Sequence, residues 1–157
     1  LEEYGHLEDT VIVAFTDHYA YPISDQNMVM ELSGVDNTYL EMRTPCFIWS
    51  YGMEPVTVDK TLNTSDLAPT LLNLFGIEND FDYLGRDAFD DDYPGYAVFS
   101  DGTWLSGGVL CSGGVVIEEL WDGAADALDI DAMEKTAAAY IRTSDAMIET
   151  DYYRRED

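Results

Sequence analysis

One uninterrupted apolar run constrains the fold more than any other feature. Residues 10–16, TVIVAFT, lack the apolar–polar alternation of a strand with one solvated face. This pattern is typical of a strand that is covered on both faces, as in the parallel sheet of an α/β protein. The run ends on Asp17 and His18. We therefore expect a central strand whose carboxyl end carries a carboxylate beside an imidazole.

Further along the chain, strand and helix patterns follow one another. Residues 43–52, RTPCFIWSYG, predict a second buried strand. Residues 64–76, TSDLAPTLLNLFG, predict a helix because their apolar side chains recur at i, i+4, i+7 and i+8. Residues 25–34 predict a short helix with Asp25 as its cap and Gly34 as its stop.

The pattern changes after residue 95. Short β-prone runs fill residues 96–120, and Ser-Gly-Gly occurs at 106–108 and again at 112–114. Both glycine pairs predict hairpin turns between antiparallel strands. The last 30 residues or so predict a helix, in which Asp131 and Glu134 have the spacing of a capping box.

These patterns predict the α/β fold class without a linker between separate domains. We expect residues 1–95 to end a main α/β layer with parallel strands. Residues 96–157 should add a small antiparallel sheet and a terminal helix.

Composition excludes some partners. The chain of 157 residues has 7 basic and 32 acidic residues, which gives a net charge of −25. Such a surface repels phosphate backbones and anionic headgroups, so nucleic acid is not an expected partner. The two cysteines, Cys46 and Cys111, lie in apolar stretches and predict buried thiols rather than a disulfide.

Asp17 and His18 are the strongest candidate site. Metal-binding residues of open α/β sheets gather at the carboxyl ends of strands, where a turning backbone lets neighbouring side chains converge. An oxygen and an imidazole nitrogen suit zinc or manganese better than calcium. Two ligands do not complete a site, and His6, the second histidine, lies in a polar lead-in. An incidental Asp-His pair is the alternative.

Other motifs have simpler explanations. Residues 80–91 approach the calcium loop of an EF-hand, but Leu84 and Asp91 occupy two of its ligand positions, so a solvated acidic loop is favoured. The Ser-Gly-Gly pairs lie between strands, where hairpin turns account for them better than phosphate binding. Helix capping accounts for the cluster of Thr64, Ser65 and Asp66, so no nucleophile is predicted there.

Taken in order, these segments resemble a known family. DTVIVAFTDHYAYP, RTPCFIWSYG and TSDLAPTLLNLFGI…LGRDAF are similar to the C-terminal half of the sulfatase-type catalytic domain of the alkaline phosphatase superfamily. The likeness is strongest to bacterial lipoteichoic acid synthases and related phosphoglycerol transferases. It covers residues 8–90 well, the hairpins weakly and the C-terminal end moderately.

The resemblance implies specific roles. Asp17 and His18 match two ligands of the catalytic metal, which would be Mn²⁺, with Mg²⁺, Zn²⁺ and Ca²⁺ as alternatives. The family's threonine nucleophile, its first acidic ligand and its substrate-binding residues precede this strand. Thr10 and Thr16 do not stand in the nucleophile's setting, so we expect no catalytic nucleophile and no further cofactor-binding residue in this chain.

The resemblance also implies a larger parent enzyme. The parent would act on phospho- or sulfo-esters, most simply by phosphoglycerol transfer from a phospholipid to a glycolipid or polymer of the cell envelope. It would be anchored in a bacterial membrane with an extracellular catalytic domain. The expected partner of this chain, itself soluble and inactive alone, is the N-terminal half of that domain. A free-standing acidic module that binds cations or proteins without catalysis is the alternative.

Overall fold

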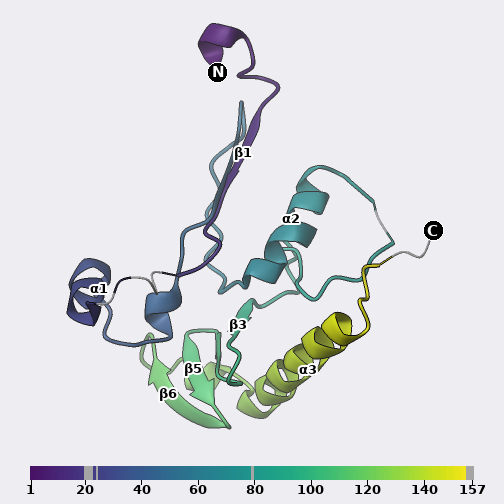
Figure 1. Ribbon diagram of the computed structural model, residues 1–157. Helices are drawn as coiled ribbons and strands as arrows, with labels where there is room; N and C mark the ends of the chain where they lie inside the picture. The colour runs from purple at the N-terminus through teal and green to yellow at the C-terminus, as the bar shows by residue number, and fades with distance from the viewer. Residues whose placement is uncertain (20–22, 24, 79, 155–157) are drawn as a thin grey trace. The chain divides into compact units, whose positions relative to one another are not determined.

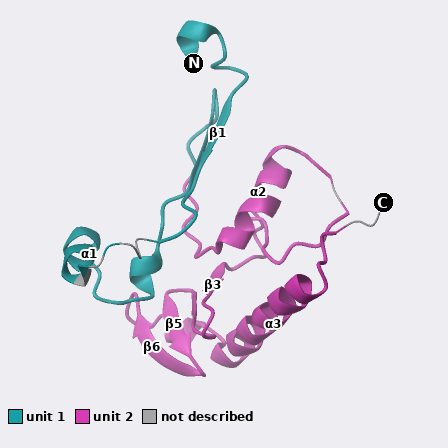
Figure 2. Cartoon of the chain, viewed as in Figure 1, with its two compact units in different colours: residues 1–56 teal, residues 57–157 magenta. Residues whose placement is uncertain are grey.

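The computed structural model describes residues 1–19, 23, 25–78 and 80–154, and the chain divides into two units (Figure 1). Unit 1 is Leu1–Val56 and unit 2 is Thr57–Asp157 (Figure 2). We describe each unit by itself. The division predicted near residue 95, between an α/β layer and the hairpins, stays a prediction.

Unit 1 contains a two-stranded sheet and short helices. Its elements are the 3-10 helix η1 (Glu2–Tyr4), β1 (Val11–Ala14), α1 (Gln26–Ser33), the 3-10 helix η2 (Leu40–Met42) and β2 (Phe47–Ser50). Strands and helices therefore form where the sequence predicted them. The short helix is confirmed in detail: the Asp25 carboxylate accepts hydrogen bonds from the amides of Asn27 and Met28, and Gly34 ends the helix at a φ of 70°.

The pairing of the two strands differs from the prediction. β1 and β2 pair antiparallel, with Val11 opposite Ser50 and Ala14 opposite Phe47. The expected parallel pairing is therefore wrong for these strands: β1 and β2 run in opposite directions and pair with each other. The expected burial is also wrong: Ile12 is 41% exposed and Phe47 is 59% exposed. Cys46, just before β2, is exposed rather than buried.

Unit 2 contains a helix, a four-stranded sheet and a long terminal helix. Its elements are η3 (Thr64–Asp66), α2 (Leu67–Leu74), β3 (Tyr96–Val98), β4 (Trp104–Ser106), β5 (Val109–Ser112), β6 (Val115–Glu119), η4 (Ala125–Ala127) and α3 (Ile130–Glu149). The sheet is an antiparallel meander in the order β3-β4-β5-β6. The expected class of mixed helices and strands, with a small antiparallel sheet and a C-terminal helix, is confirmed.

The two Ser-Gly-Gly repeats form the predicted hairpin turns. Gly107 and Gly108 connect β4 to β5 at φ values of 53° and 77°. Gly113 and Gly114 connect β5 to β6 at φ values of 56° and 76°. Two consecutive positive φ values define the tight turn that matches the twist of antiparallel strands, and glycine adopts them without a steric penalty.

The core of unit 2 lies between the sheet and α3. It contains six buried residues: Trp104, Val109, Cys111, Ala124, Met133 and Ala137. Glu134 joins the two layers, because its Oε1 accepts hydrogen bonds from the Trp104 indole at 2.9 Å and from the Gly114 amide at 2.7 Å. The predicted capping box is therefore wrong: Asp129 caps α3 by accepting from the Ala132 amide, and Glu134 faces the sheet.

Candidate functional site

Asp17 and His18 lie just beyond the end of β1, as the sequence predicted. Their side chains are 87% and 46% exposed, and Oδ1 of Asp17 lies 3.5 Å from Nε2 of His18. Two protein ligands bound to one ion at about 2.1 Å in tetrahedral geometry are themselves about 3.4 Å apart. The structure therefore brings these two donors together at a separation that suits a shared cation.

The hydrogen bonding of His18 selects which ring nitrogen faces the aspartate. Nδ1 lies 2.8 Å from the carbonyl oxygen of Tyr19, which only accepts, so Nδ1 carries the proton and donates it. In the neutral ring the lone pair is then on Nε2, opposite the Asp17 carboxylate. A carboxylate oxygen and an imidazole lone pair that face each other in this way can bind one metal ion between them. Metal-ligating histidines are commonly oriented in this way by a backbone carbonyl.

Among the residues that the structure describes, a third ligand is not found near this pair. Across residues 1–19, 23, 25–78 and 80–154, no group of three or more histidine, cysteine, aspartate or glutamate residues could hold a metal ion. The donor set of this chain fits two ligands of a metal site, and the assignment of Asp17 and His18 as metal ligands stays a prediction.

The acidic stretch 80–91 is organised by turns rather than by converging ligands. Asp87 accepts from the Phe89 amide, and Asp90 accepts from the Asp92 amide and pairs with Arg86. These bonds hold the pKa of the Asp90 carboxyl below its usual range. The structure thus assigns the Asp87 and Asp90 carboxylates to local turns, and the preference for a solvated acidic loop stays a prediction.

The cluster of Thr64, Ser65 and Asp66 forms a structural junction. Asp66 is buried and accepts three hydrogen bonds, from the amides of Asn63 and Arg86 at 2.8 Å and from the Tyr93 hydroxyl at 3.0 Å. Burial raises the pKa of the Asp66 carboxyl, and these three bonds act in the opposite direction. Asn63 and Asp66 also form a reciprocal capping box.

Sequence reasoning identified Asp66 only as a local cap. It did not predict that its carboxylate would tie the start of α2 to residues 86 and 93. The indication in the sequence was the glycine of LGRDAF, Gly85, which packs against the segment TSDLAPT. A Cβ on Gly85 would lie 2.2 Å from the Ser65 carbonyl oxygen, so glycine is required at this contact. Ser65 is likewise structural, since its hydroxyl lies 2.8 Å from the hydroxyl of Tyr140 on α3.

Comparison with known proteins identifies the family of this chain. The sulfatase family profile matches residues 1–77, a range that contains the Asp17–His18 pair and α2. Lipoteichoic acid synthase 2 of Bacillus subtilis is 30% identical over 115 residues. The lipoteichoic acid synthase-like protein YvgJ of the same species is 28% identical over 116 residues, and the lipoteichoic acid synthase of Staphylococcus saprophyticus is 30% identical over 112 residues.

Each of these matches covers 68% of the chain but only 17 to 19% of the relative. The chain therefore spans less than a fifth of the length of these proteins and covers only part of a sulfatase domain. In the part of the chain that the structure describes, no helix is both long and apolar enough to cross a membrane. The chain thus belongs to the sulfatase family, as part of a sulfatase-type domain related to the lipoteichoic acid synthases.

Proposed function

We propose that this chain is the C-terminal part of the catalytic domain of a metal-dependent enzyme that acts on phospho- or sulfo-esters. The most specific form of the proposal is phosphoglycerol transfer from a phospholipid to a glycolipid or polymer of the cell envelope. One observation carries it. The Asp17–His18 pair stands at the end of β1, inside the segment that matches the sulfatase family.

Within this proposal Asp17 and His18 supply two ligands of a divalent metal, Mn²⁺ before Mg²⁺, Zn²⁺ or Ca²⁺. When bound, such an ion lowers the pKa of an attacking hydroxyl and stabilises negative charge at phosphorus or sulfur. The role of this chain is to present the Asp17 carboxylate and the His18 Nε2 at a fixed separation. The Tyr19 carbonyl holds the imidazole in the tautomer that leaves Nε2 as the ligand.

The remaining components belong to the parent protein. We assign the nucleophile, the other metal ligands and the substrate-binding residues to the part of the domain outside this chain. The parent is proposed to be anchored in a bacterial membrane, with its catalytic domain on the outer side. The 157-residue chain alone should show no turnover and no tight Mn²⁺ binding, because two exposed ligands do not complete a site.

Substitution of the two ligands in the full-length protein tests the proposal. Asp17→Asn and His18→Gln should each reduce kcat/KM by at least about 100-fold, as expected when a metal ligand is lost. Substrates for the assay are a phosphatidylglycerol lipid, p-nitrophenyl phosphate and p-nitrophenyl sulfate. The matched controls are Asp36→Asn and His6→Gln, which change exposed residues of unit 1 and should leave turnover unchanged.

The three substrates separate the finer alternatives. Turnover of the lipid alone supports phosphoglycerol transfer, whereas turnover of the sulfate ester alone points to a sulfatase. Wild-type turnover in both Asp17→Asn and His18→Gln would show that the metal assignment is wrong. A sub-micromolar Mn²⁺ site in the 157-residue chain, abolished by His18→Ala, would contradict the prediction that this chain is incomplete.

A further inference from the structure

The charge of unit 2 is far out of balance. Residues 57–157 contain 22 acidic and 6 basic residues, which gives this unit a formal net charge of −16. Even if every basic side chain paired with one carboxylate, 16 carboxylates would have no cationic partner. Two of the pairs that form are local, between Arg86 and Asp90 and between Arg154 and Asp151. Ion pairing within unit 2 therefore cannot neutralise its surface.

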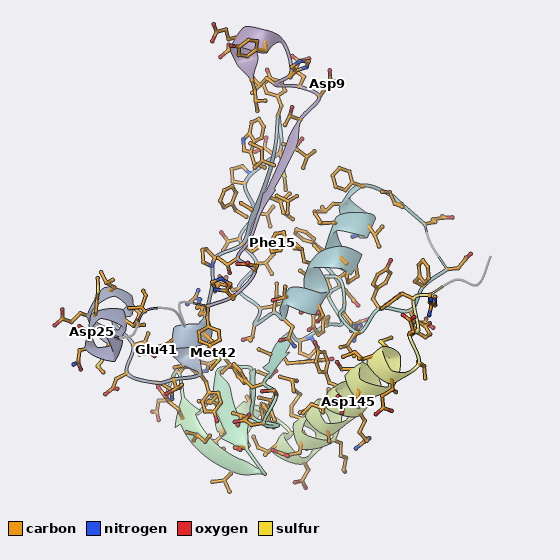
Figure 3. The ribbon with its side chains drawn as sticks, in the orientation of Figure 1. Asp9, Phe15, Asp25, Glu41, Met42 and Asp145 are labelled. Carbon is orange, nitrogen blue, oxygen red and sulfur yellow. The ribbon has the colours of Figure 1, made fainter. Side chains whose placement is uncertain are left out.

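The excess carboxylates are spread over unit 2 rather than gathered in one site. Asp91, Asp122, Asp126 and Asp145 lie in the turn before β3, in the loop after β6, in η4 and in α3, and all four are exposed. The stick view shows Asp145 on α3 (Figure 3). Within the described ranges, the structure contains no group of three or more potential metal ligands. One bound cation therefore does not offset this charge.

The apolar core that opposes this repulsion is small. It consists of Trp104, Val109, Cys111, Ala124, Met133 and Ala137. The net stability of a domain is a small difference between large opposing terms. A net charge far from zero destabilises the compact state through self-repulsion. The repulsion among the carboxylates of unit 2 therefore acts against a core that has little stability to spare.

The range of this repulsion depends on salt. A folded domain of about 100 residues has a radius of gyration of about 13 Å, and the same chain unfolded has about 30 Å. The screening length is about 30 Å at 0.01 M salt and about 3 Å at 1 M. At 0.01 M every carboxylate of folded unit 2 thus repels every other, whereas at 1 M only close neighbours do. Unfolding spreads the charges apart, so it relieves much more repulsion at low salt.

We infer that unit 2 is an ionic-strength-sensitive switch, closed when dissolved cations screen its carboxylates and increasingly open as they are withdrawn. This part of the domain is therefore built for a medium rich in salt. The inference does not depend on the proposed function, because it concerns the surface charge and the core of unit 2 and involves neither Asp17 nor His18.

The thiol of Cys111 reports the opening of unit 2 in the 157-residue chain. Cys111 is completely buried between the sheet and α3, and Cys46→Ser leaves it as the single thiol. Iodoacetamide is uncharged, so the charge of the protein does not steer its approach. The labelling rate, divided by the rate of the urea-unfolded chain in the same salt, should fall at least about 100-fold between 0.01 M and 1 M KCl.

Two matched variants separate charge from other effects of salt. The first combines Asp91→Asn, Asp122→Asn, Asp126→Asn and Asp145→Asn, which removes four negative charges. The second places Glu at the same four positions and keeps the charge. At 0.01 M KCl the amide variant should label at least about 10-fold more slowly than its parent, and the Glu variant should label like the parent. At 1 M KCl all three should agree within about twofold, because screening has then replaced the substitutions.

The two salts NaCl and KCl should act alike, as screening requires. A labelling rate that does not change with salt would overturn the inference. Equal slowing in the amide and Glu variants would also overturn it, since charge would then not be the cause. Protection by millimolar MgCl₂ that 1 M KCl does not reproduce would identify a bound ion in place of screening, and would likewise overturn it.

Discussion

The two units of this chain have similar apolar residues but reach different structures. In unit 2, Trp104, Val109 and Cys111 are completely buried under α3. In unit 1, Trp49 and Phe47 belong to an equally apolar strand, yet Phe47 is 59% exposed. The difference shows that apolar strands create a core within a unit only when a second layer of that unit packs against them.

The order of the elements along the chain gives a physical reason for this difference. In unit 2, turns of two glycines join β4 to β5 and β5 to β6, and α3 follows the sheet after the short helix η4, so the strands and the covering helix come from one continuous segment. In unit 1, the helices α1 and η2 lie between β1 and β2 in the chain, and α1 contacts η2. The following predictions test whether unit 2 is folded by itself and unit 1 is not.

Thiol reactivity should give the largest contrast. Cys46 is exposed in unit 1, whereas Cys111 is buried in unit 2 and burial raises the pKa of its thiol. In the 157-residue chain, Cys46 should react with a disulfide reagent at least about 1,000-fold faster than Cys111, which reacts only when unit 2 unfolds. Reaction rates of Cys46→Ser and Cys111→Ser assign the two phases. Comparable rates at both thiols would show that unit 2 is not independently folded.

Equivalent tryptophan truncations should differ between the units. Trp104→Ala should lower the free energy of unfolding by about 3–5 kcal/mol, because it empties a fully buried site and removes a donor to Glu134. Trp49→Ala in the same chain should cost less than about 1 kcal/mol, as expected of a site without a surrounding core. Urea denaturation followed by circular dichroism measures both. A larger loss for Trp49→Ala would contradict the comparison.

Gly85 should be intolerant of a side chain. Gly85→Ala should destabilise unit 2 by about 1–3 kcal/mol, since its Cβ would overlap the backbone of Ser65 and force α2 away from residues 84–86. The control is Gly76→Ala: its φ is 61° but its surroundings are open, so it carries only the backbone cost of about 1 kcal/mol. Thermal unfolding of both variants measures the difference. Equal shifts would mean that the junction between α2 and this loop contributes little.

The smallest effect should be a pH-dependent one at Glu134. Hydrogen bonds from the Gly114 amide and the Trp104 indole lower the pKa of this carboxyl below its usual range. A lowered folded-state pKa stabilises unit 2 above the pKa of the unfolded carboxyl, and this stabilisation is lost as the pH falls through the folded-state pKa.

Glu134→Gln should therefore cost about 1–2 kcal/mol near pH 7 and less as the pH approaches about 3. Urea denaturation of the wild type and the variant across this range measures the difference. A cost that does not change with pH would show that the charge of Glu134 is not what joins α3 to the sheet.

Local chemistry allowed much of this structure to be predicted from the sequence. The glycine pairs at 107–108 and 113–114 determined two hairpin turns, and Asp25 with Gly34 determined the limits of α1. The order of TDHY, TPCFIWS and DLAPTLL identified the sulfatase family. These features depend mainly on a few neighbouring residues, so they could be predicted without knowledge of distant contacts.

Other features depend on contacts between distant segments, and the sequence did not predict them. The antiparallel pairing of β1 with β2 depends on which strands are available, and the exposure of Cys46 depends on what covers β2. Glu134 was assigned to a cap, but the sheet offers it an indole and an amide. Asp66 likewise became a buried junction because Arg86 and Tyr93 return to it.

The sequence by itself therefore determined the family, the local elements and the adjacency of Asp17 and His18. Only the tertiary structure decided which apolar residues form the core of unit 2 and which strands pair in unit 1. The physical reason is that backbone conformation is set by neighbouring residues, whereas burial needs a second surface, which α3 supplies for the sheet within unit 2.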